Sequence, residues 1–254
     1  MTATVDDLNQ LAIRVETPCR VDLAGGTLDV APLMTFEAPV VTVNAAIDVL
    51  SRADLRVRTD GRVVIRSEDR GHEIRYESVA ELMESTTRTP LDLLVNTLRY
   101  WSPPTGLSLT THTEAPEGSG LGASSSVMVA VLGALTTMFG GRYGEQEEVD
   151  DYRLIGRATT LEARHLLVPT GTQDHFAALY GGPLAIRYDM DGAYPDKLAL
   201  SAPMRDFLSS HMLVFYTGVA HHSAAPNWSI VKGYIDGDGG TRERIGTIKR
   251  IARD

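Results

Sequence analysis

The chain has 254 residues, 43% hydrophobic and 22% charged, a composition typical of one large globular domain or two smaller ones. Its formal net charge of -9 disfavours general binding to nucleic acids and membrane surfaces, because both require basic patches. Cys19 is the only cysteine, which excludes an intrachain disulfide and a cysteine-bound zinc, and we expect it to be a small buried residue.

No apolar run in the sequence is long enough to cross a bilayer. Residues 1–7 carry acids where a secretory signal peptide would carry bases. These two features predict a cytoplasmic protein without a membrane partner.

The first half of the chain is predicted to consist mainly of strands. A helix is expected at residues 91–101, before Pro103-Pro104. Asp60-Gly61 separates two apolar runs and accepts the backbone of a tight turn, so we expect the runs on either side to pair as a β-hairpin. Alternating or β-branched runs lie at residues 13–16, 21–23, 40–43, 55–58, 63–66, 72–76 and 107–110.

Helices dominate the region after residue 123. Residues 127–139 are apolar almost all round, which predicts a core helix that ends at Gly140-Gly141. Further helices are expected at about 147–167, from Gln173 to Gly181-Gly182, and from Thr241 to the end, with strands at 184–188 and 212–216. This order predicts the α+β class rather than an alternating α/β fold, and it disfavours a dinucleotide-binding dehydrogenase.

The segment from Pro116 to Ser126 contains Gly118, Gly120 and Gly122 and then three serines. Glycine allows backbone N–H groups to approach an anion closely, and a helix N-terminus adds unpaired N–H groups. The segment therefore predicts a phosphate site, with hydroxyls that can reach a phosphate-bound Mg²⁺. The alternative is an ordinary loop with a serine cap.

Two carboxylates follow this loop in the sequence, Glu162 in the second expected helix and Asp174 in the first turn of the third. Phosphoryl transfer uses such groups to hold Mg²⁺ and to accept the proton of the acceptor hydroxyl. The alternatives are a solvated helix face for Glu162, although it could also lie at the edge of a cleft, and dipole complementarity for Asp174.

The segment from Thr17 to Asp29 is predicted to be a strand that enters a Gly-Gly turn, with Arg20 and Asp22 along it. Asp29, beyond the turn, is a candidate for binding substrate hydroxyls, and an ordinary hairpin with a polar turn is the alternative. His221-His222 is disfavoured as a metal site, because adjacent side chains of a strand point to opposite faces and no third ligand is near in sequence.

Together these segments resemble the GHMP small-molecule kinases, and most closely their sugar-kinase branch, which includes the heptose-phosphate kinases and galactokinase. Pro116–Ser126 is similar to the Pro-x-x-x-Gly-Leu-Gly-Ser-Ser-Ala signature, with Ala123 in place of the first serine. Residues 17–29 resemble the first motif of the family, and residues 171–182 look most like the sugar-kinase branch. The resemblance spans nearly all of the chain.

The resemblance implies a role for each matching residue. Asp174 is expected to be the catalytic base, with Arg20 beside it to favour its ionised form. Mg²⁺ is expected on Glu162 and Ser124, with Ser125 as the alternative to Ser124. The substrate is expected to contact Asp22, Gly25, Gly26, Thr27, Asp29 and Gln173. ATP is expected to contact Pro116, Gly118, Ser119, Gly120, Leu121, Gly122, Ala123, Ser124, Ser125 and Ser126.

The implied fold is that of the GHMP kinases, with an N-terminal domain like domain 2 of ribosomal protein S5 at residues 1–182. Residues 183–254 are expected to be an incomplete ferredoxin-like C-terminal domain. The third glycine-rich motif of the family is not found near the C-terminus, so we expect a truncated gene product or a fragment.

The implied function is ATP-dependent phosphorylation of a hydroxyl group on a sugar or sugar phosphate, similar to a heptose phosphate. The alternative is a relative that binds a sugar or nucleotide without catalysis. The oligomeric state stays open, with a homodimer as one option.

Overall fold

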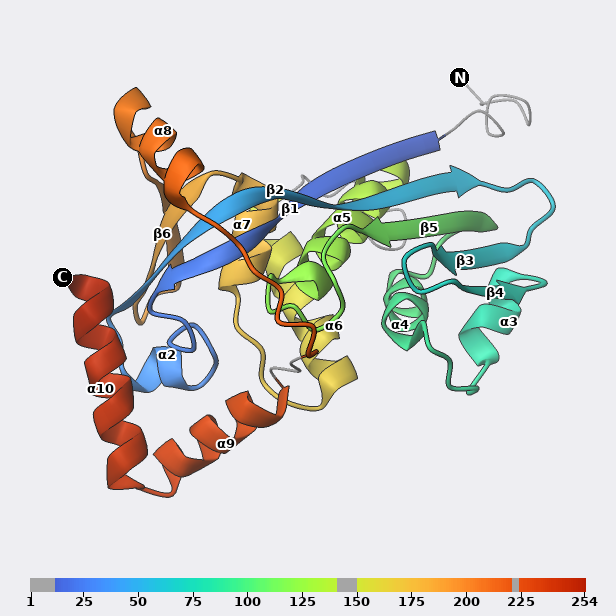
Figure 1. Cartoon of the computed structure of the whole chain (residues 1–254). Coiled ribbons are helices and arrows are strands. Elements are labelled where there is room, and N and C mark those ends of the chain that lie inside the picture. Colours follow the sequence, from blue (N-terminus) through green and yellow to red (C-terminus); the bar gives the residue numbers. More distant parts are fainter. Residues whose placement is uncertain (1–11, 141–149, 221–223) are drawn as a thin grey trace. The chain divides into compact units, whose positions relative to one another are not determined.

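A computed structural model describes residues 12–140, 150–220 and 224–254, which form α-helices and a mixed β-sheet (Figure 1). The α+β class expected from the sequence is confirmed. The chain divides into two compact units. Unit 1 comprises Met1–Thr17, Val49–Glu114 and Ser124–Leu167, and unit 2 comprises Pro18–Asp48, Ala115–Ala123 and Val168–Asp254.

Unit 1 contains the strands β3 (Val63–Ser67), β4 (His72–Tyr76) and β5 (Leu107–Thr113) and the second half of β2 (Val40–Val57). Their order is β4-β3-β5-β2. Strand β5 runs antiparallel to β2 and parallel to β3, so that Leu109 pairs with Leu55 on one side and Ile65 on the other. These three side chains are buried, and the alternation of each strand therefore directs one face of the sheet to the core.

The β-hairpin predicted around Asp60-Gly61 is wrong, although the turn residue behaves as expected. Gly61 has a positive φ of 74°, as a tight turn at Asp60-Gly61 requires. However, β5 lies between β2 and β3 and pairs with both. Turn chemistry decides only how the chain reverses, whereas the pairing of buried side chains across strands decides which strands are neighbours.

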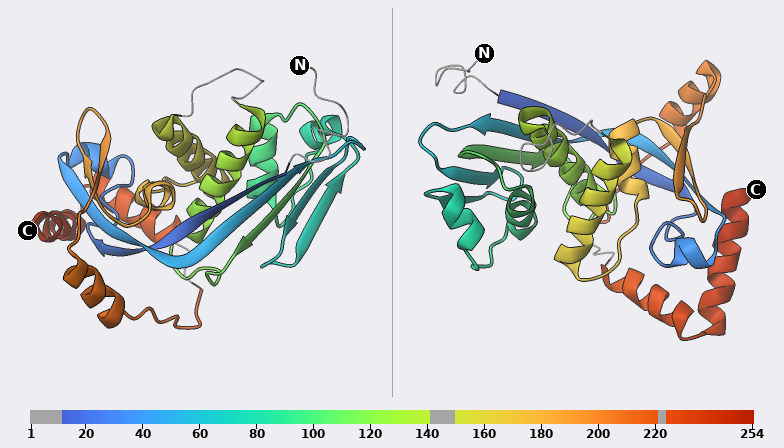
Figure 2. Two further views of the ribbon diagram at one scale, coloured as in Figure 1. Left: turned by 90° about the horizontal axis from the view of Figure 1, so that it is seen from above. Right: turned by 180° about the vertical axis from the view of Figure 1, so that it is seen from behind.

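The helices of unit 1 are α3 (Val79–Glu84), α4 (Asp92–Trp101), α5 (Ala123–Phe139) and α6 (Asp151–Leu166), although Ala123 itself belongs to unit 2. Helices α4, α5 and α6 lie over one face of the strands (Figure 2). The predicted core helix is confirmed: α5 buries most of its residues and ends before Gly140, which has a φ of 74°. Asp150 caps α6, while the predicted start at residue 147 lies outside the described residues.

Unit 2 contains the second part of β1 (Ala12–Ala24), the first half of β2, and the hairpin of β6 (Pro183–Tyr188) and β7 (Ala193–Lys197). Strand β6 runs antiparallel to β2. The strand predicted at 212–216 is wrong, because the described residues show no strand pairing there and Phe215 is 82% exposed. A strand needs a neighbouring strand, and apolar side chains alone do not supply one.

The helices of unit 2 are α2 (Leu33–Phe36), α7 (Gln173–Tyr180), α8 (Ala202–His211), α9 (Ala224–Ile235) and α10 (Gly239–Arg253). The predicted α7 and α10 are confirmed, and α2, α8 and α9 were not predicted. Glu37 at the end of α2 accepts a hydrogen bond from the hydroxyl of Tyr234 of α9 at 2.5 Å. Its carboxylate also forms an ion pair with Lys249 of α10 at 3.3 Å. These contacts hold the last two helices against α2.

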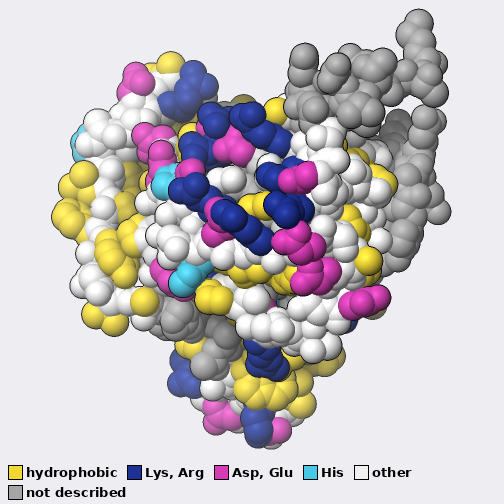
Figure 3. Space-filling view, turned by 90° about the vertical axis from the view of Figure 1, so that its right-hand side faces the viewer, with side chains coloured by type: hydrophobic (Ala, Val, Ile, Leu, Met, Phe, Trp, Pro, Cys, Tyr) yellow, Lys and Arg dark blue, Asp and Glu magenta, His cyan; other side chains and the backbone are white. Residues whose placement is uncertain are grey.

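One surface of the molecule gathers arginine and lysine side chains with aspartate and glutamate between them (Figure 3). In unit 1 the ion pairs include Arg14–Asp54 at 2.6 Å and Arg52–Glu68 at 2.8 Å. Such exposed pairs contribute little to stability.

In the described part of the chain, none of the helices has the length and apolar character needed to cross a membrane.

Candidate active site

The glycine-rich loop of unit 2 has a backbone that requires glycine at alternate positions. Gly118, Gly120 and Gly122 have φ angles of 68°, 75° and 73°, a region that residues with a Cβ atom avoid. A Cβ atom on Gly120 would meet no described atom within 4 Å, so this part of the loop faces open space. The loop can therefore present its backbone to a ligand at close range, as an anion site requires.

Gly122 also lies against a carboxylate. A Cβ atom built on it would stand 2.9 Å from Oδ2 of Asp174 in the first turn of α7. Only glycine fits this contact without displacement of the carboxylate. The structure therefore brings together the loop and Asp174, which are about 50 residues apart in the sequence.

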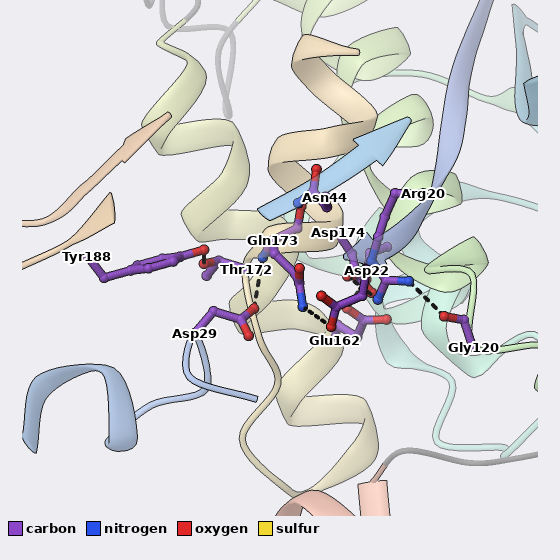
Figure 4. Close-up of polar contacts among 11 residues, drawn as sticks. Arg20, Asp22, Asp29, Asn44, Gly120, Glu162, Thr172, Gln173, Asp174 and Tyr188 are labelled. Atoms are coloured by element: carbon purple, nitrogen blue, oxygen red, sulfur yellow. Dashed lines mark hydrogen bonds and ion pairs between the residues drawn. The ribbon is translucent and has the colours of Figure 1, made fainter. Parts of the chain in front are cut away.

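Arg20 on β1 ties the loop to α7 (Figure 4). Its Nε donates to Oδ1 of Asp174 at 2.7 Å, and its Nη1 donates to the carbonyl oxygen of Gly120 at 2.7 Å. Its backbone N–H also donates to the carbonyl oxygen of Leu121 at 3.0 Å. Arg20 thus connects strand β1 to the glycine-rich loop and to the first turn of α7.

The ion pair with Asp174 stabilises the charged form of Arg20. Burial alone would lower the pKa of Arg20, but attraction to Asp174 and the hydrogen bond to it outweigh burial, and the pKa is raised. The side chains of Arg20 and Asp174 are 11% and 22% exposed. Asp174 therefore faces a permanent cation while part of its carboxylate stays accessible, which is the arrangement that a general base needs.

Three of the residues predicted to bind substrate form a chain of contacts at the start of α7 (Figure 4). Oδ2 of Asp29 accepts the backbone N–H of Gln173 at 2.9 Å, and Nε2 of Gln173 donates to Oδ2 of Asp22 at 3.4 Å. Gly26 borders this chain, because a Cβ atom there would stand 1.8 Å from Oδ2 of Asp22. Burial raises the pKa of Asp22.

Gly25 and Thr27, also predicted to bind substrate, form the turn itself. Their φ angles are 82° and 81°, and a Cβ atom on Gly25 would stand 2.1 Å from the carbonyl oxygen of Val41. For Thr27 this is an unusual backbone conformation, and such strain is often found at functional sites. In the glycine-rich loop, the carbonyl oxygen of Pro116 accepts the backbone N–H of Ser119 at 3.1 Å, which closes a turn.

A second cluster lies in unit 1. Ser125 in the first turn of α5 donates a hydrogen bond to Oε2 of Glu162 on α6 at 2.8 Å, and these side chains belong to residues that are 3% and 4% exposed. The alternative of a solvated helix face for Glu162 is therefore wrong. A hydroxyl and a carboxylate are hard oxygen donors, the type that Mg²⁺ prefers.

The three serines of α5 have different surroundings. Ser124 is exposed, whereas Ser126 is buried against Thr17 of β1, whose hydroxyl donates to the carbonyl oxygen of Ser126 at 2.9 Å. The hydroxyl of Ser125 contacts the carboxylate of Glu162, as described above. Of the two serines proposed from the sequence, the geometry favours Ser125.

Several residues near the start of α7 were missed by sequence reasoning. Nδ2 of Asn44 donates to the carbonyl oxygen of Gln173 at 3.4 Å, and the hydroxyl of Thr172 donates to that of Tyr188 at 3.0 Å. Asn44 and Tyr188 are polar residues within apolar strands, which is a weak signal.

Cys19 is buried beside Arg20, as predicted, and His221-His222 lies outside the described residues.

Burial raises the pKa of Asp29 to about 6, from an ordinary value of 3.8. The folded chain therefore binds more protons than the unfolded chain between these values, and stability falls as pH rises through this window. Titration of Asp29 should lower the unfolding free energy of the wild type by about 2 kcal/mol between pH 4.5 and pH 7. Asp29→Asn should lack this part of the pH dependence, because asparagine does not titrate. Urea unfolding of both proteins at the two pH values measures this, and an equal pH dependence would contradict it.

Residues 88–182 match the family model described as "GHMP kinases N terminal domain". Over 219 residues the chain is 27% identical to the D-glycero-alpha-D-manno-heptose 7-phosphate kinase of Campylobacter jejuni, covering 83% of this chain and 61% of that protein. It is 25% identical over 249 residues to the L-fucokinase/L-fucose-1-P guanylyltransferase of Bacteroides fragilis, covering 86% of this chain and 25% of that protein. The chain thus spans less than two thirds of these relatives.

Solved structures share the fold. The D-glycero-D-manno-heptose 1-phosphate kinase of Bacteroides thetaiotaomicron has a TM-score of 0.68 and 26% identity, over 79% of this chain and 64% of that chain. The mevalonate kinase of Methanococcus jannaschii has a TM-score of 0.67 at 14% identity, over 95% of this chain and 71% of that chain. The expected fold of the GHMP kinases is confirmed.

Proposed function

Because residues 88–182 match the family model of the GHMP kinase N-terminal domain, we propose that this chain is part of an ATP-dependent kinase that phosphorylates a hydroxyl group of a sugar or sugar phosphate. The observation that carries the proposal is the ion pair of Arg20 and Asp174 against the glycine-rich loop. The similarity to heptose phosphate kinases favours a heptose phosphate as the acceptor. Within this proposal, residues 1–182 are the ATP-binding domain and 183–254 belong to the C-terminal domain.

Asp174 would act as the base. Its carboxylate accepts the proton of the acceptor hydroxyl while the oxygen of that hydroxyl forms a bond to the γ-phosphorus of ATP. The bond between the γ-phosphorus and the bridging oxygen breaks, ADP leaves, and Asp174 returns the proton to solvent. Arg20 holds the carboxylate in place, because its Nε donates a hydrogen bond of 2.7 Å to Oδ1 of Asp174.

The glycine-rich loop would bind the phosphates of ATP. The open space beside Gly120 allows close approach, and the contact of Gly122 with Asp174 brings the loop next to the base. Arg20 holds the loop by two carbonyl oxygens, which keeps its donors oriented before the nucleotide binds. Preorganisation of this kind lowers the cost of binding.

Ser125 and Glu162 would hold Mg²⁺ that arrives with the nucleotide. The fit rests on their buried contact of 2.8 Å and on the hard oxygen atoms of both groups. Within the described residues no group of three or more His, Cys, Asp or Glu side chains could hold a metal by itself. This agrees with the usual Mg²⁺ site of kinases, in which phosphates complete a small set of protein ligands. When bound, the ion neutralises charge on the phosphates.

We expect Glu162→Gln to raise the Mg²⁺ concentration for half-maximal activity by about tenfold, because one anionic ligand is lost. A Mg²⁺ titration of the initial rate at saturating ATP measures this. Glu84→Gln, which changes an exposed glutamate of α3, is the control and should leave the titration unchanged. A Mg²⁺ titration of Glu162→Gln that overlays that of the wild type would exclude Glu162 as a ligand.

The function is tested with a coupled ADP-release assay on hexoses, heptoses and their phosphates. The expected result is ADP release that depends on one acceptor class, with sugar phosphates strongest. If calorimetry shows nucleotide binding while ADP release stays at background with every acceptor, the chain is a non-catalytic binder and the proposal is wrong. The assay is best run on the protein that contains this whole chain, since the chain spans 61% of its heptose kinase relative.

A further inference from the structure

Residues 25–37, which we call the acceptor segment, carry four of the residues for which the resemblance implies contact with the substrate: Gly25, Gly26, Thr27 and Asp29. The segment has little regular structure of its own, since its helix α2 has only four residues. Thr27 has a φ of 81°, a conformation that persists only where the surrounding structure enforces it. The acceptor segment therefore needs support from other elements.

Helices α9 and α10 hold one end of the acceptor segment, at Glu37. The hydroxyl of Tyr234 on α9 donates to Oε1 of Glu37 at 2.5 Å. The ammonium group of Lys249 on α10 donates to the backbone carbonyl oxygen of Glu37 and forms an ion pair with its Oε2 at 3.3 Å. Phe36 stacks on the ring of Tyr234, with the ring centroids 6.1 Å apart. Two helices thus hold both the backbone and the side chains at this end.

Helix α10 also reaches the other end of the acceptor segment, at Gly25. A Cβ atom built on Gly25 would stand 3.0 Å from Cβ of Ala252 on α10 and 2.1 Å from the carbonyl oxygen of Val41 on β2. The backbone of the turn is therefore packed closely against both α10 and β2. Lys249 and Ala252 are three residues apart, so they lie on the same face of their helix. One face of α10 thus contacts both ends of the segment.

We propose that α9 and α10 form a bracket for the acceptor segment, in which Lys249 and Ala252 are positioning residues that fix the turn at Gly25 in the conformation that binds the acceptor. The inference rests on the proposed function, because the acceptor is the substrate of that reaction. The contacts that define the bracket end on the acceptor segment rather than on the pair of Arg20 and Asp174. The bracket therefore acts on binding of the acceptor and not on phosphoryl transfer.

The kinetic test compares Lys249→Met with the wild type, in the protein that contains this whole chain. Methionine fills a similar space but has neither the charge nor the donors of lysine. A segment that is less ordered before binding must be ordered by the acceptor, which weakens binding. We therefore expect KM for the acceptor to rise about tenfold, while kcat and KM for ATP change less than about threefold. An unchanged KM for the acceptor, with or without a fall in kcat, would overturn the proposal.

Two further variants of lysine residues complete this test. Lys249→Arg keeps the cation, so it should bring KM for the acceptor to within about threefold of the wild type. Lys232→Met is the matched control, because Lys232 pairs with Asp236 within α9 and their side chains are 60% and 56% exposed. Its kinetic constants should equal those of the wild type. A rise of KM in this control as large as in Lys249→Met would overturn the proposal, because loss of any lysine charge would then suffice.

Ala252→Val tests the other end of the bracket. Valine is stiff at χ1, so its added methyl groups have few ways to turn away from the backbone of Gly25. We expect KM for the acceptor to rise about tenfold here as well, with kcat within about threefold of the wild type. A wild-type KM for the acceptor in Ala252→Val would show that α10 does not support the turn, and the proposal would be wrong.

Hydrogen exchange without substrate separates this inference from the proposed function. The amide of Glu37 donates to the carbonyl oxygen of Leu33 at 2.9 Å, and the amide of Leu28 donates to that of Gly25 at 3.1 Å. We expect the Glu37 amide to exchange at least about tenfold faster in Lys249→Met, and the Leu28 amide to do so in Ala252→Val.

Unchanged exchange at either amide refutes the bracket, whether or not the wild type transfers phosphate. Faster exchange at both amides, in a protein that transfers phosphate to none of the acceptors, supports the bracket and overturns only the proposed function.

Discussion

Asp174→Asn is expected to lower kcat by about 10³-fold, within the range that general-base catalysis contributes. Asparagine has the shape of aspartate and can still accept a hydrogen bond from Arg20, but it cannot take up the proton of the acceptor hydroxyl. Affinity for ATP should change little, because the loop that would bind the phosphates keeps its contacts with Arg20. Steady-state kinetics together with calorimetric titration of ATP measure the two effects.

The same substitution should also cost stability, because it leaves the guanidinium of Arg20, 11% exposed, without its counter-ion. We expect a loss of roughly 2 kcal/mol in unfolding free energy. Asp60→Asn is the matched control, since Asp60 pairs with Arg58 in an exposed turn and belongs to neither cluster. Its kcat should equal that of the wild type. Wild-type turnover in Asp174→Asn would remove Asp174 as the base.

Gly122→Ala is expected to lower kcat by about 10²-fold, because its Cβ atom would stand 2.9 Å from Oδ2 of Asp174 and must displace that carboxylate. Its backbone φ of 73° adds a strain of about 1 kcal/mol for any residue with a Cβ atom. The variant should therefore lose both activity and stability. Kinetics and urea unfolding measure the two losses.

Gly61→Ala is the control that separates the effect of backbone strain from the effect of displacing a carboxylate. Gly61 has nearly the same φ, 74°, but a Cβ atom there would meet no described atom within 4 Å. This control should therefore lose about 1 kcal/mol of stability and keep the wild-type kcat. If Gly122→Ala also kept the wild-type kcat, the close contact between the loop and Asp174 would have no role in the reaction.

The two clusters could be predicted to different degrees. Arg20 and Asp174 stood out because each lies beside a glycine-rich or helix-starting motif, and the structure joins them at 2.7 Å. For the proposed metal ligand, the resemblance favoured Ser124, with Ser125 as the alternative. Consecutive helix residues point about 100° apart, so only the position of α6 decides which serine meets Glu162.

The burial of Asp29 was beyond sequence reasoning for a similar reason. The sequence indicates only that Asp29 follows a Gly-Gly turn, where it is a candidate for binding substrate hydroxyls. Its burial depends on the chain before α7, which folds over it from 144 residues away. A partner at that distance in sequence leaves no local pattern.

Local backbone chemistry was determined by the sequence alone. The positive φ angles of the loop glycines, the buried helix α5 and the end of α7 at Gly181 follow from glycine freedom and hydrophobic periodicity, which act over a few residues. Tertiary structure decided the rest: the insertion of β5 between β2 and β3, the hydrogen bond of Ser125 to Glu162, and the burial of Asp29. These features depend on which distant surfaces bury each other, and the free energy of that burial is a property of the whole chain.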